Sequence, residues 1–339
     1  MGGVSVCLAA LLVLQGSARP LPAPSPPAQT AVSPQARAYL AEALQIMKTR
    51  ALDRYRVDWV AEERLAFVRA NGARTPWDTY PAIRAATKAL GNPHSFFLSP
   101  GEAPAALQDP ADAQRTPDGQ LIGTELGYLV MPGIRSDGAV AAAYVRSGAA
   151  AVRDIDRSSP CGWIVDLRQA DGGNMFPLLA VLAPLLGEGT TGYFQDADGR
   201  RTSWGIRDGT PVLNGVPEAP GNNYRLHRPD PPVAVLTGPA TASAGEAALV
   251  AFTGREQTRV FGQPTAGLAT GNKAFVLSDG AVLILTTSND LDRTGRIYGN
   301  SPIAPDEAVA EVPNGDAPRQ AAAAWLGRQS ACRHPNAER

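Results

Sequence analysis

The stretch VAVLTGPATASAGE (residues 233–246) decides the fold, together with a second stretch, IVDLRQADGGN (residues 164–174). Each is an apolar run of strand length followed by small and polar residues that begin a helix, so each predicts a strand-to-helix junction. In the first junction Ser243 lies beside unpaired backbone N–H groups and the positive end of a helix, where a nucleophile is favoured. In the second, Gly172 and Gly173 can bring another bare N–H group to the same spot, because glycine has no Cβ. The pair predicts a nucleophile that faces an oxyanion hole.

Overall composition narrows the class of protein. The chain has 339 residues, of which 44% are hydrophobic and 19% charged, enough for one large domain and a smaller one. Lys and Arg number 31 against 32 Asp and Glu, so no basic field would gather nucleic acid, and we expect no nucleic-acid partner. The sequence has no His-x-x-x-His, no Cys-x-x-Cys and no Walker-type phosphate loop, so we expect no metal and no cofactor.

Residues 1–18 carry the features of a secretory signal peptide. An apolar run at residues 6–14 precedes small residues suited to a signal peptidase, although no Lys or Arg comes before the run. We therefore expect a periplasmic or secreted protein; an untrimmed hydrophobic tail or a misassigned start is the alternative. No other stretch approaches the roughly 18 apolar residues of a spanning helix, so we expect no stable membrane span in the mature chain.

The predicted export determines which cysteines the mature chain keeps. Cys7 would leave with the signal, so that the mature chain keeps Cys161 and Cys332. Two cysteines in an oxidising compartment allow one disulfide, which would fasten the C-terminal tail to the start of the strand leading into the glycine junction. Two unpaired buried thiols are the alternative.

The remaining chain divides into four segments. Residues 19–33 form a proline-rich linker, and residues 34–98 carry apolar residues at helical spacing, which predicts an N-terminal helical domain. Residues 99–125, rich in Pro, Ala, Asp and Gly, are typical of a flap or loop, and residues 126–335 alternate between strand and helix patterns. We expect helices after Ser33-Pro34, from Trp59 to Ala70 and from Pro76 to Leu90. In the core we expect strands at 126–131, 162–168 and 233–237, helices at 138–156, 174–186 and 244–252, and a hairpin of 274–277 with 281–285. This alternation predicts a layered α/β core with parallel pairs.

A base for Ser243 has to come from elsewhere in the chain. Of the three histidines, His227 and His334 lie in polar segments typical of solvated surface. His94 follows a helix-ending Gly-Asn-Pro and precedes an aromatic anchor, so a fixed loop could hold its imidazole over a cleft. Ser243 itself has a simpler reading as a helix N-cap, a place that Thr241 could also take, and it lacks the preceding glycine of an α/β-hydrolase elbow.

Four motifs in this order resemble one known family. They are DLR with GG (166–173), TASAGE (241–246), GQPTAG (262–267) and IAPD (303–306). Over roughly residues 90–315 the chain resembles the tail-specific (C-terminal processing) serine proteases, which include the tricorn core and the retinoid-binding modules. The resemblance implies a crotonase-like (ClpP/crotonase) spiral of ββα units behind the helical domain. It also implies roles for individual residues: Ser243 as nucleophile, and the N–H groups of Ala244 and of Gly172 or Gly173 as the oxyanion hole.

The chain departs from the best-known branch of that family. The lysine that follows the Gly-x-Pro-Thr-x-Gly motif there is Leu268 here, so the resemblance to the tricorn-like branch makes His94 the preferred base. The acid that orients the histidine in that branch would fall near Gly299, and Asp292 is the nearest substitute. Lys273 keeps a Ser/Lys mechanism open as an alternative.

These inferences combine into one function with open alternatives. We expect an exported serine peptidase that acts on a peptide or protein through an acyl-enzyme. Residues 99–125 are too short for the PDZ module that many members insert, so the helical domain and the flap would select the substrate. A non-catalytic ligand- or peptide-binding module of the same fold, as the retinoid-binding relatives imply, is the alternative, and a scaffold role of the helical domain could be added to either.

Overall fold

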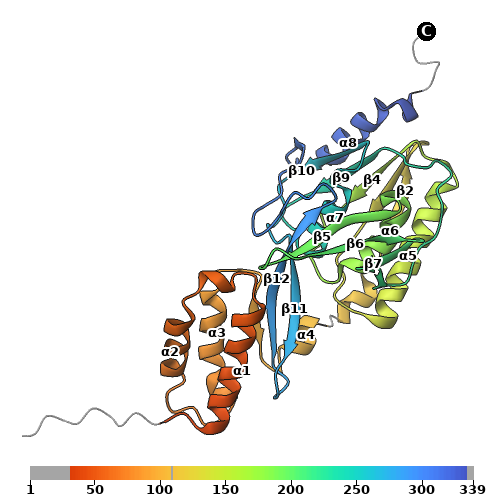
Figure 1. Ribbon diagram of the computed structural model, residues 1–339. Helices are drawn as coiled ribbons and strands as arrows, with labels where there is room; N and C mark the ends of the chain where they lie inside the picture. Colours follow the sequence, from red (N-terminus) through yellow and green to blue (C-terminus); the bar gives the residue numbers. More distant parts are fainter. Residues whose placement is uncertain (1–30, 108–109, 334–339) are drawn as a thin grey trace, which may run out of the picture.

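A computed structural model describes residues 31–107 and 110–333 (Figure 1). The predicted signal peptide at 1–18 and most of the predicted linker lie outside the described residues, as does His334. None of the helices in the described part of the chain is long and apolar enough to cross a membrane.

The N-terminal region is a bundle of three helices, α1 (Pro34–Arg50), α2 (Trp59–Arg69) and α3 (Tyr80–Ala89), with short 3-10 turns η1 (Arg54–Arg56) and η2 (Trp77–Thr79). The N-cap of α1 is Ser33, whose Oγ accepts from the N–H of Ala36 at 3.2 Å. The apolar faces meet in a core that also includes Leu283 and Leu285 of a long strand described below. The bundle therefore packs on a hairpin of the main body (Figure 1).

Six strands form the first sheet, in the order β13-β10-β9-β4-β3-β2. All neighbours are parallel except β2 with β3. The strands are β2 (Asp118–Ile122), β3 (Leu126–Val130), β4 (Gly162–Asp166), β9 (Val233–Thr237), β10 (Thr258–Gly262) and β13 (Glu307–Ala308). Every residue of β4 and β9 is buried, as expected for parallel strands covered on both faces.

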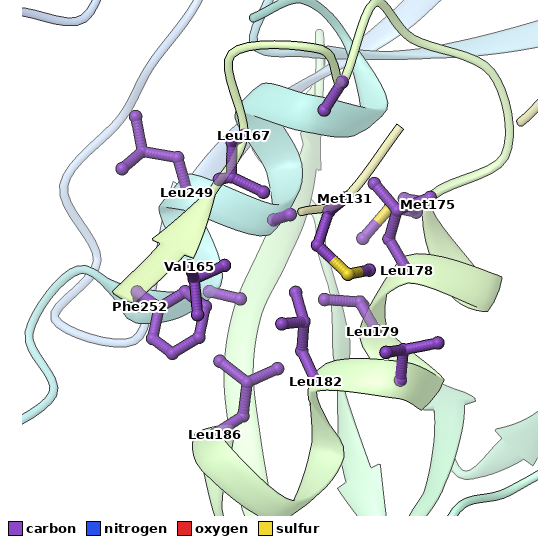
Figure 2. Packing of buried hydrophobic residues seen from close by; sticks show 14 of the residues in the cluster. Met131, Val165, Leu167, Met175, Leu178, Leu179, Leu182, Leu186, Leu249 and Phe252 are labelled. Atoms are coloured by element: carbon purple, nitrogen blue, oxygen red, sulfur yellow. The ribbon is translucent and has the colours of Figure 1, made fainter. Parts of the chain in front are cut away.

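Helices cover both faces of this sheet. One face packs on α5 (Gly138–Asp156), α6 (Met175–Leu186) and α7 (Ala244–Phe252), in the core shown in Figure 2. Val165 and Leu167 meet Leu249 and Phe252 there, and Met131 meets Leu179. The other face packs on α8 (Ala317–Gly327), through Ala322 and Leu326. This arrangement fixes where β4 and β9 end and where α6 and α7 begin.

The second sheet is antiparallel and lies on the other side of α6 and α7. Its order is β1-β12-β5-β6-β7-β8, with β11 pairing to β12. The strands are β1 (Phe96–Leu98), β5 (Gly189–Asp196), β6 (Arg201–Arg207), β7 (Thr210–Leu213), β8 (Val216–Pro217), β11 (Thr270–Val276) and β12 (Val282–Asp292). The predicted hairpin forms, but β12 extends seven residues beyond the predicted 281–285 into the main body, a path visible in Figure 1.

Two parts of the chain differ from the sequence-based expectation. Residues 99–125, predicted as a flap or loop, contain α4 (Ala103–Leu107), a 3-10 turn η3 (Pro110–Gln114) and β2. Residues 189–217 form four strands that the sequence pattern had not revealed. Only β5 pairs with a distant strand, β12, whereas β2, β6, β7 and β8 pair with strands next to them in sequence. These segments contain glycine, proline and charged residues, which are depleted in strands and weaken the sequence pattern. The structure confirms the disulfide, which joins Cys161 to Cys332 across 171 residues, with Cα atoms 5.0 Å apart.

Candidate active site

The two strand-to-helix junctions meet, because polar groups of one bond to the backbone of the other. The hydroxyl of Thr241 donates to the carbonyl of Leu167 at 2.9 Å, and the N–H of Ala242 donates to the carbonyl of Ala170 at 3.0 Å. Thr241 is fully buried and therefore links the junctions instead of capping α7. These bonds place residue 243 beside the glycine turn.

Ser243 adopts a backbone conformation that is uncommon for a residue with a side chain. Its φ is 50° and its ψ is −109°, at the N-cap of α7. A strand-to-helix turn that exposes a strained serine is also the geometry of a nucleophile elbow. The N–H of Ser243 donates to Glu246 at 3.0 Å, so it is not free to bind a ligand. The side chain borders a pocket of about 580 Å³.

Glu246 is the buried anchor behind this turn. It is 0% exposed, and its carboxylate accepts hydrogen bonds from Thr265 Oγ1 at 2.5 Å and from the amides of Gly267 at 2.9 Å and Leu268 at 2.7 Å, besides that of Ser243. Charged acceptors of this kind make strong hydrogen bonds. The carboxylate thereby fixes the loop of the third sequence motif against the first turn of α7.

Gly172 and Gly173 face Ser243 with φ values of 116° and 104°, which side chains rarely tolerate. A Cβ on Gly172 would lie 3.4 Å from the Cβ of Ser243, and a Cβ on Gly173 would lie 2.0 Å from the carbonyl oxygen of Ile134. Among the described residues, the N–H groups of Gly172, Gly173 and Ala244 donate to no other group. Three unsatisfied backbone donors therefore lie around Ser243.

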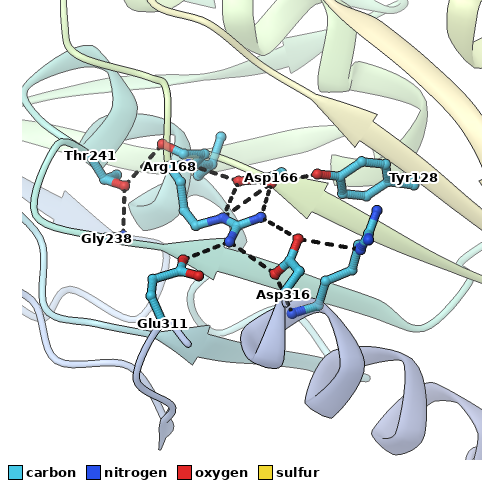
Figure 3. A network of polar contacts seen from close by, with 9 residues as sticks. Tyr128, Asp166, Arg168, Gly238, Thr241, Glu311 and Asp316 are labelled. Atoms are coloured by element: carbon cyan, nitrogen blue, oxygen red, sulfur yellow. Dashed lines mark hydrogen bonds and ion pairs between the residues drawn. The ribbon is translucent and has the colours of Figure 1, made fainter. Parts of the chain in front are cut away.

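An ion-pair network holds the chain that leads into the glycine turn (Figure 3). Arg168 binds Asp166 at 2.6 Å, Glu311 at 2.7 Å and Asp316 at 3.0 Å, and Asp166 also accepts from the hydroxyl of Tyr128. The network connects the end of β4 to the first turn of α8. It makes the position of the turn depend on the C-terminal helix.

His94 lies between the helical bundle and the hairpin. Its ring Nδ1 is 2.8 Å from the hydroxyl of Thr270. Its backbone N–H donates to Asn92 Oδ1 at 3.0 Å, and its backbone carbonyl accepts from Asn272 Nδ2 at 3.0 Å. Burial lowers the pKa of the imidazole to about 4, so the ring is neutral at neutral pH. Thr270 lines the same pocket as Ser243. Within the described chain, however, no hydrogen bond joins His94 to Ser243.

The other candidate residues have different surroundings. Asp292 accepts from Thr294, Arg296 and the hydroxyl of Tyr298, which makes it the centre of the turn after β12. The structure does not bring it into contact with His94. Lys273 borders the pocket with an exposed side chain, and, within the described chain, no hydrogen bond joins it to Ser243.

Two residues near Ser243 escaped the sequence analysis. Thr270 holds the His94 ring, and Asp290, only 1% exposed, lines the pocket. Thr270 carried no local signal, because its role arises from pairing across 176 residues. Asp290 could have been noticed as a carboxylate within a long β pattern.

A family model identifies the core. Residues 125–309 match the model of peptidase family S41. The chain belongs to peptidase family S41. This membership confirms the resemblance to C-terminal processing proteases that the four motifs indicated.

Individual relatives extend the likeness beyond the core. The chain is 27% identical over 279 residues to the nisin-resistance protein of Lactococcus lactis subsp. lactis, covering 81% of this chain and 84% of that one. A lipoprotein from Streptococcus agalactiae superposes with a TM-score of 0.70 at 24% identity, covering 87% of this chain and 97% of the other. The photosystem II D1 C-terminal processing protease superposes with a TM-score of 0.59 at 17% identity, covering 88% of this chain and 99% of the other. The two structures show a shared mixed α/β fold.

Proposed function

We propose that this chain is an exported serine peptidase that cleaves peptide bonds through an acyl-enzyme on Ser243, with His94 as the general base. One observation carries the proposal: Ser243 lies in a left-handed backbone conformation at the start of α7, bordering a pocket and surrounded by three unsatisfied N–H groups. Backbone donors around a nucleophile can stabilise the oxyanion of a tetrahedral intermediate. Membership of a peptidase family supports the reaction class.

In this mechanism the Ser243 hydroxyl attacks the substrate carbonyl and gives its proton to His94, which later returns it to the leaving amine. A neutral ring can accept that proton, and burial keeps His94 neutral. If Nδ1–H donates to Thr270, Nε2 is left as the acceptor. The amides of Gly172, Gly173 and Ala244 would receive the developing negative charge. The Ser243 and His94 side chains would approach further when a substrate closes the site, as catalytic contacts often do.

Two further features belong to this proposal. We infer that the two sheets and their helices form a crotonase-like spiral of ββα units, which the alternation of β3, α5, β4, α6, β9 and α7 supports. We also infer export by the N-terminal signal. Similarity to a lipoprotein and to a nisin-resistance protein is compatible with an envelope or secreted location.

The test compares two serines that both occupy helix N-caps. Ser243→Ala should abolish both peptide hydrolysis and labelling by a fluorophosphonate probe, and should leave the fold intact. Ser33→Ala removes the N-cap of α1, so it should cost about 1 kcal/mol of stability and no activity. If Ser243→Ala keeps full activity, the assignment is wrong. If the wild-type protein takes up no probe and hydrolyses no peptide, the chain is a binding module of the same fold.

A further inference from the structure

The pocket beside Ser243 contains a buried carboxyl group that the proposed reaction does not use. Asp290 lies on β12, is 1% exposed, and lines the pocket together with Ser243 and Ala247. Its backbone is held by bonds to Ala269 at 3.2 Å and Tyr298 at 2.8 Å. Its Oδ1 atom has no hydrogen-bond partner in the described structure. A buried polar atom without a partner is costly, and Asp290 lines the pocket, so a ligand group that reaches its carboxyl group could supply the missing partner.

Asp290 differs from its neighbour Glu246 in its hydrogen bonds. Within the described structure, Glu246 has four donors around its carboxylate, whereas Asp290 Oδ1 has none. Burial, followed by the charge of Glu246, raises the pKa of Asp290 to about 8. At neutral pH Asp290 is therefore a carboxylic acid, which offers one O–H donor and one C=O acceptor side by side.

The charges around the pocket argue against an ionic ligand. Besides Asp290, the charged groups on the surrounding elements are Glu246 on α7, Asp292 farther along β12, Asp196, Asp198 and Arg200 around the β5–β6 turn, Lys273 on β11, and Arg50 and Arg54 from the helical bundle. Arg54 and Arg200 are both paired with Asp198, whereas Arg50 and Lys273 have no ion pair within the described residues. These two cations disfavour a cationic ligand. The buried charge of Glu246 disfavours an anion next to Asp290.

The ligand class that remains is an uncharged group with a hydrogen-bond donor and an acceptor side by side. We propose that Asp290 selects peptides that place an asparagine or glutamine side chain in this pocket, through a pair of hydrogen bonds between its carboxyl group and the side-chain carboxamide. The carboxamide N–H donates to the Asp290 C=O, and the Asp290 O–H donates to the carboxamide oxygen. Phe176, Phe194 and Leu213 supply apolar wall for the methylene groups. This assignment rests on the proposed peptidase function and adds a substrate preference to it.

The test measures binding without turnover, in the Ser243→Ala protein. Two fluorescent peptides that differ only at one position, glutamine against norleucine, are compared by anisotropy, with that position scanned along the peptide. At pH 6.5 the best glutamine peptide should bind about tenfold more tightly than its norleucine partner, because two neutral hydrogen bonds are gained. At pH 9.5 the preference should weaken, because ionised Asp290 still accepts from the carboxamide N–H but has lost the O–H that donates to the carboxamide oxygen.

Two substitutions of Asp290 separate this assignment from a structural role. Asp290→Asn keeps a donor beside an acceptor, so it should retain the glutamine preference at both pH values. Asp290→Leu should lose it at both, while its thermal unfolding checks that it is folded. A lysine or glutamate peptide that binds more tightly than glutamine overturns the assignment, as does a preference that Asp290→Leu retains or the absence of measurable binding by every peptide.

The outcomes also separate this inference from the proposed function. Wild-type protein that hydrolyses peptides while Ser243→Ala shows no glutamine preference would refute only the role of Asp290. A pH-dependent preference in a wild-type protein that hydrolyses nothing would refute only the peptidase.

Discussion

The parallel and the antiparallel sheets contribute to the pocket in different ways. The parallel sheet delivers Ser243 and the glycine turn at the ends of strands that are buried on every residue, so these groups are fixed by local backbone geometry and an apolar core. The antiparallel sheet delivers Asp290 on β12 and Thr270 on β11, and Thr270 contacts His94 across 176 residues of sequence. The turn that carries the proposed nucleophile is thus encoded in the local chain, and bonds between the two junctions hold it in place. The proposed base is placed by tertiary packing alone.

The packing behind His94 runs through the helical bundle. Asn92 accepts from both the N–H of His94 and the hydroxyl of Thr286 on β12, and Ser95 accepts from the N–H of Thr286 at 2.9 Å. The N–H of Leu52, just after α1, donates to the carbonyl of Thr286 at 2.8 Å. The bundle therefore positions the imidazole. Substitutions of the residues around His94 should alter proton transfer without disturbing Ser243.

Among changes around the proposed base, removing the imidazole should have the largest effect. We expect His94→Ala to lower kcat on the order of 10²–10⁴-fold, because a general base is lost, while the structure around Ser243 is retained. In the wild type kcat/KM should rise through about pH 4 and stay level towards neutrality, since the neutral ring is the active form. Unchanged hydrolysis by His94→Ala would transfer the role of base elsewhere, with Lys273→Met as the next variant to assay.

The same substitution should change the pH dependence of stability. The pKa of His94 falls from an ordinary 6.5 to about 4 on folding, so below pH 6.5 the unfolded chain binds a proton that the folded chain does not. The wild type should lose stability as the pH falls from 6.5 to 4, and His94→Ala should lose less over that interval. Denaturant unfolding at pH 7 and pH 4.5 measures the difference. If the unfolding free energies of the two proteins changed equally between pH 7 and pH 4.5, the burial of a neutral His94 ring would be contradicted.

Changing the partner of the ring should have a smaller effect. Thr270→Val keeps the shape of the side chain and removes the hydroxyl 2.8 Å from Nδ1, so we expect kcat to fall about tenfold with KM nearly unchanged. The acid limb of the pH profile should shift as well, because the ring is no longer held in one tautomer. Thr270→Ser should restore the rate. A loss of rate in Thr270→Ser without a loss in Thr270→Val would mean that the methyl group, and not the hydroxyl, matters.

This contrast also explains what the sequence could predict. Alternating patterns and short motifs located β4, α6, β9 and α7, because apolar periodicity and small turn residues are local signals. They could not locate β5 to β8, because the glycine, proline and charged residues of these strands weaken the strand pattern. They could not locate the pairing of Thr270 with His94 either, because it joins segments 176 residues apart. Asp292 was chosen for its nearness in sequence to the place of the family's acid. In the folded chain its carboxylate is occupied by the turn at 294–298.

The smallest effect on activity should come from the far end of the parallel sheet. The Cys161–Cys332 bond ties the C-terminal segment to the residue before β4, at the opposite end of the molecule from the helical bundle (Figure 1). Because it closes a loop of 171 residues, the double variant Cys161→Ala/Cys332→Ala should lose about 2–5 kcal/mol of unfolding free energy. It should keep its kcat, because the ion pairs of Arg168 still hold α8 and the glycine turn. Denaturant unfolding and hydrolysis assays of the same preparation measure both quantities. A large fall in kcat in a folded variant would show that the end of β4 is controlled from α8, and the nucleophile side would then depend on tertiary packing as much as the base does.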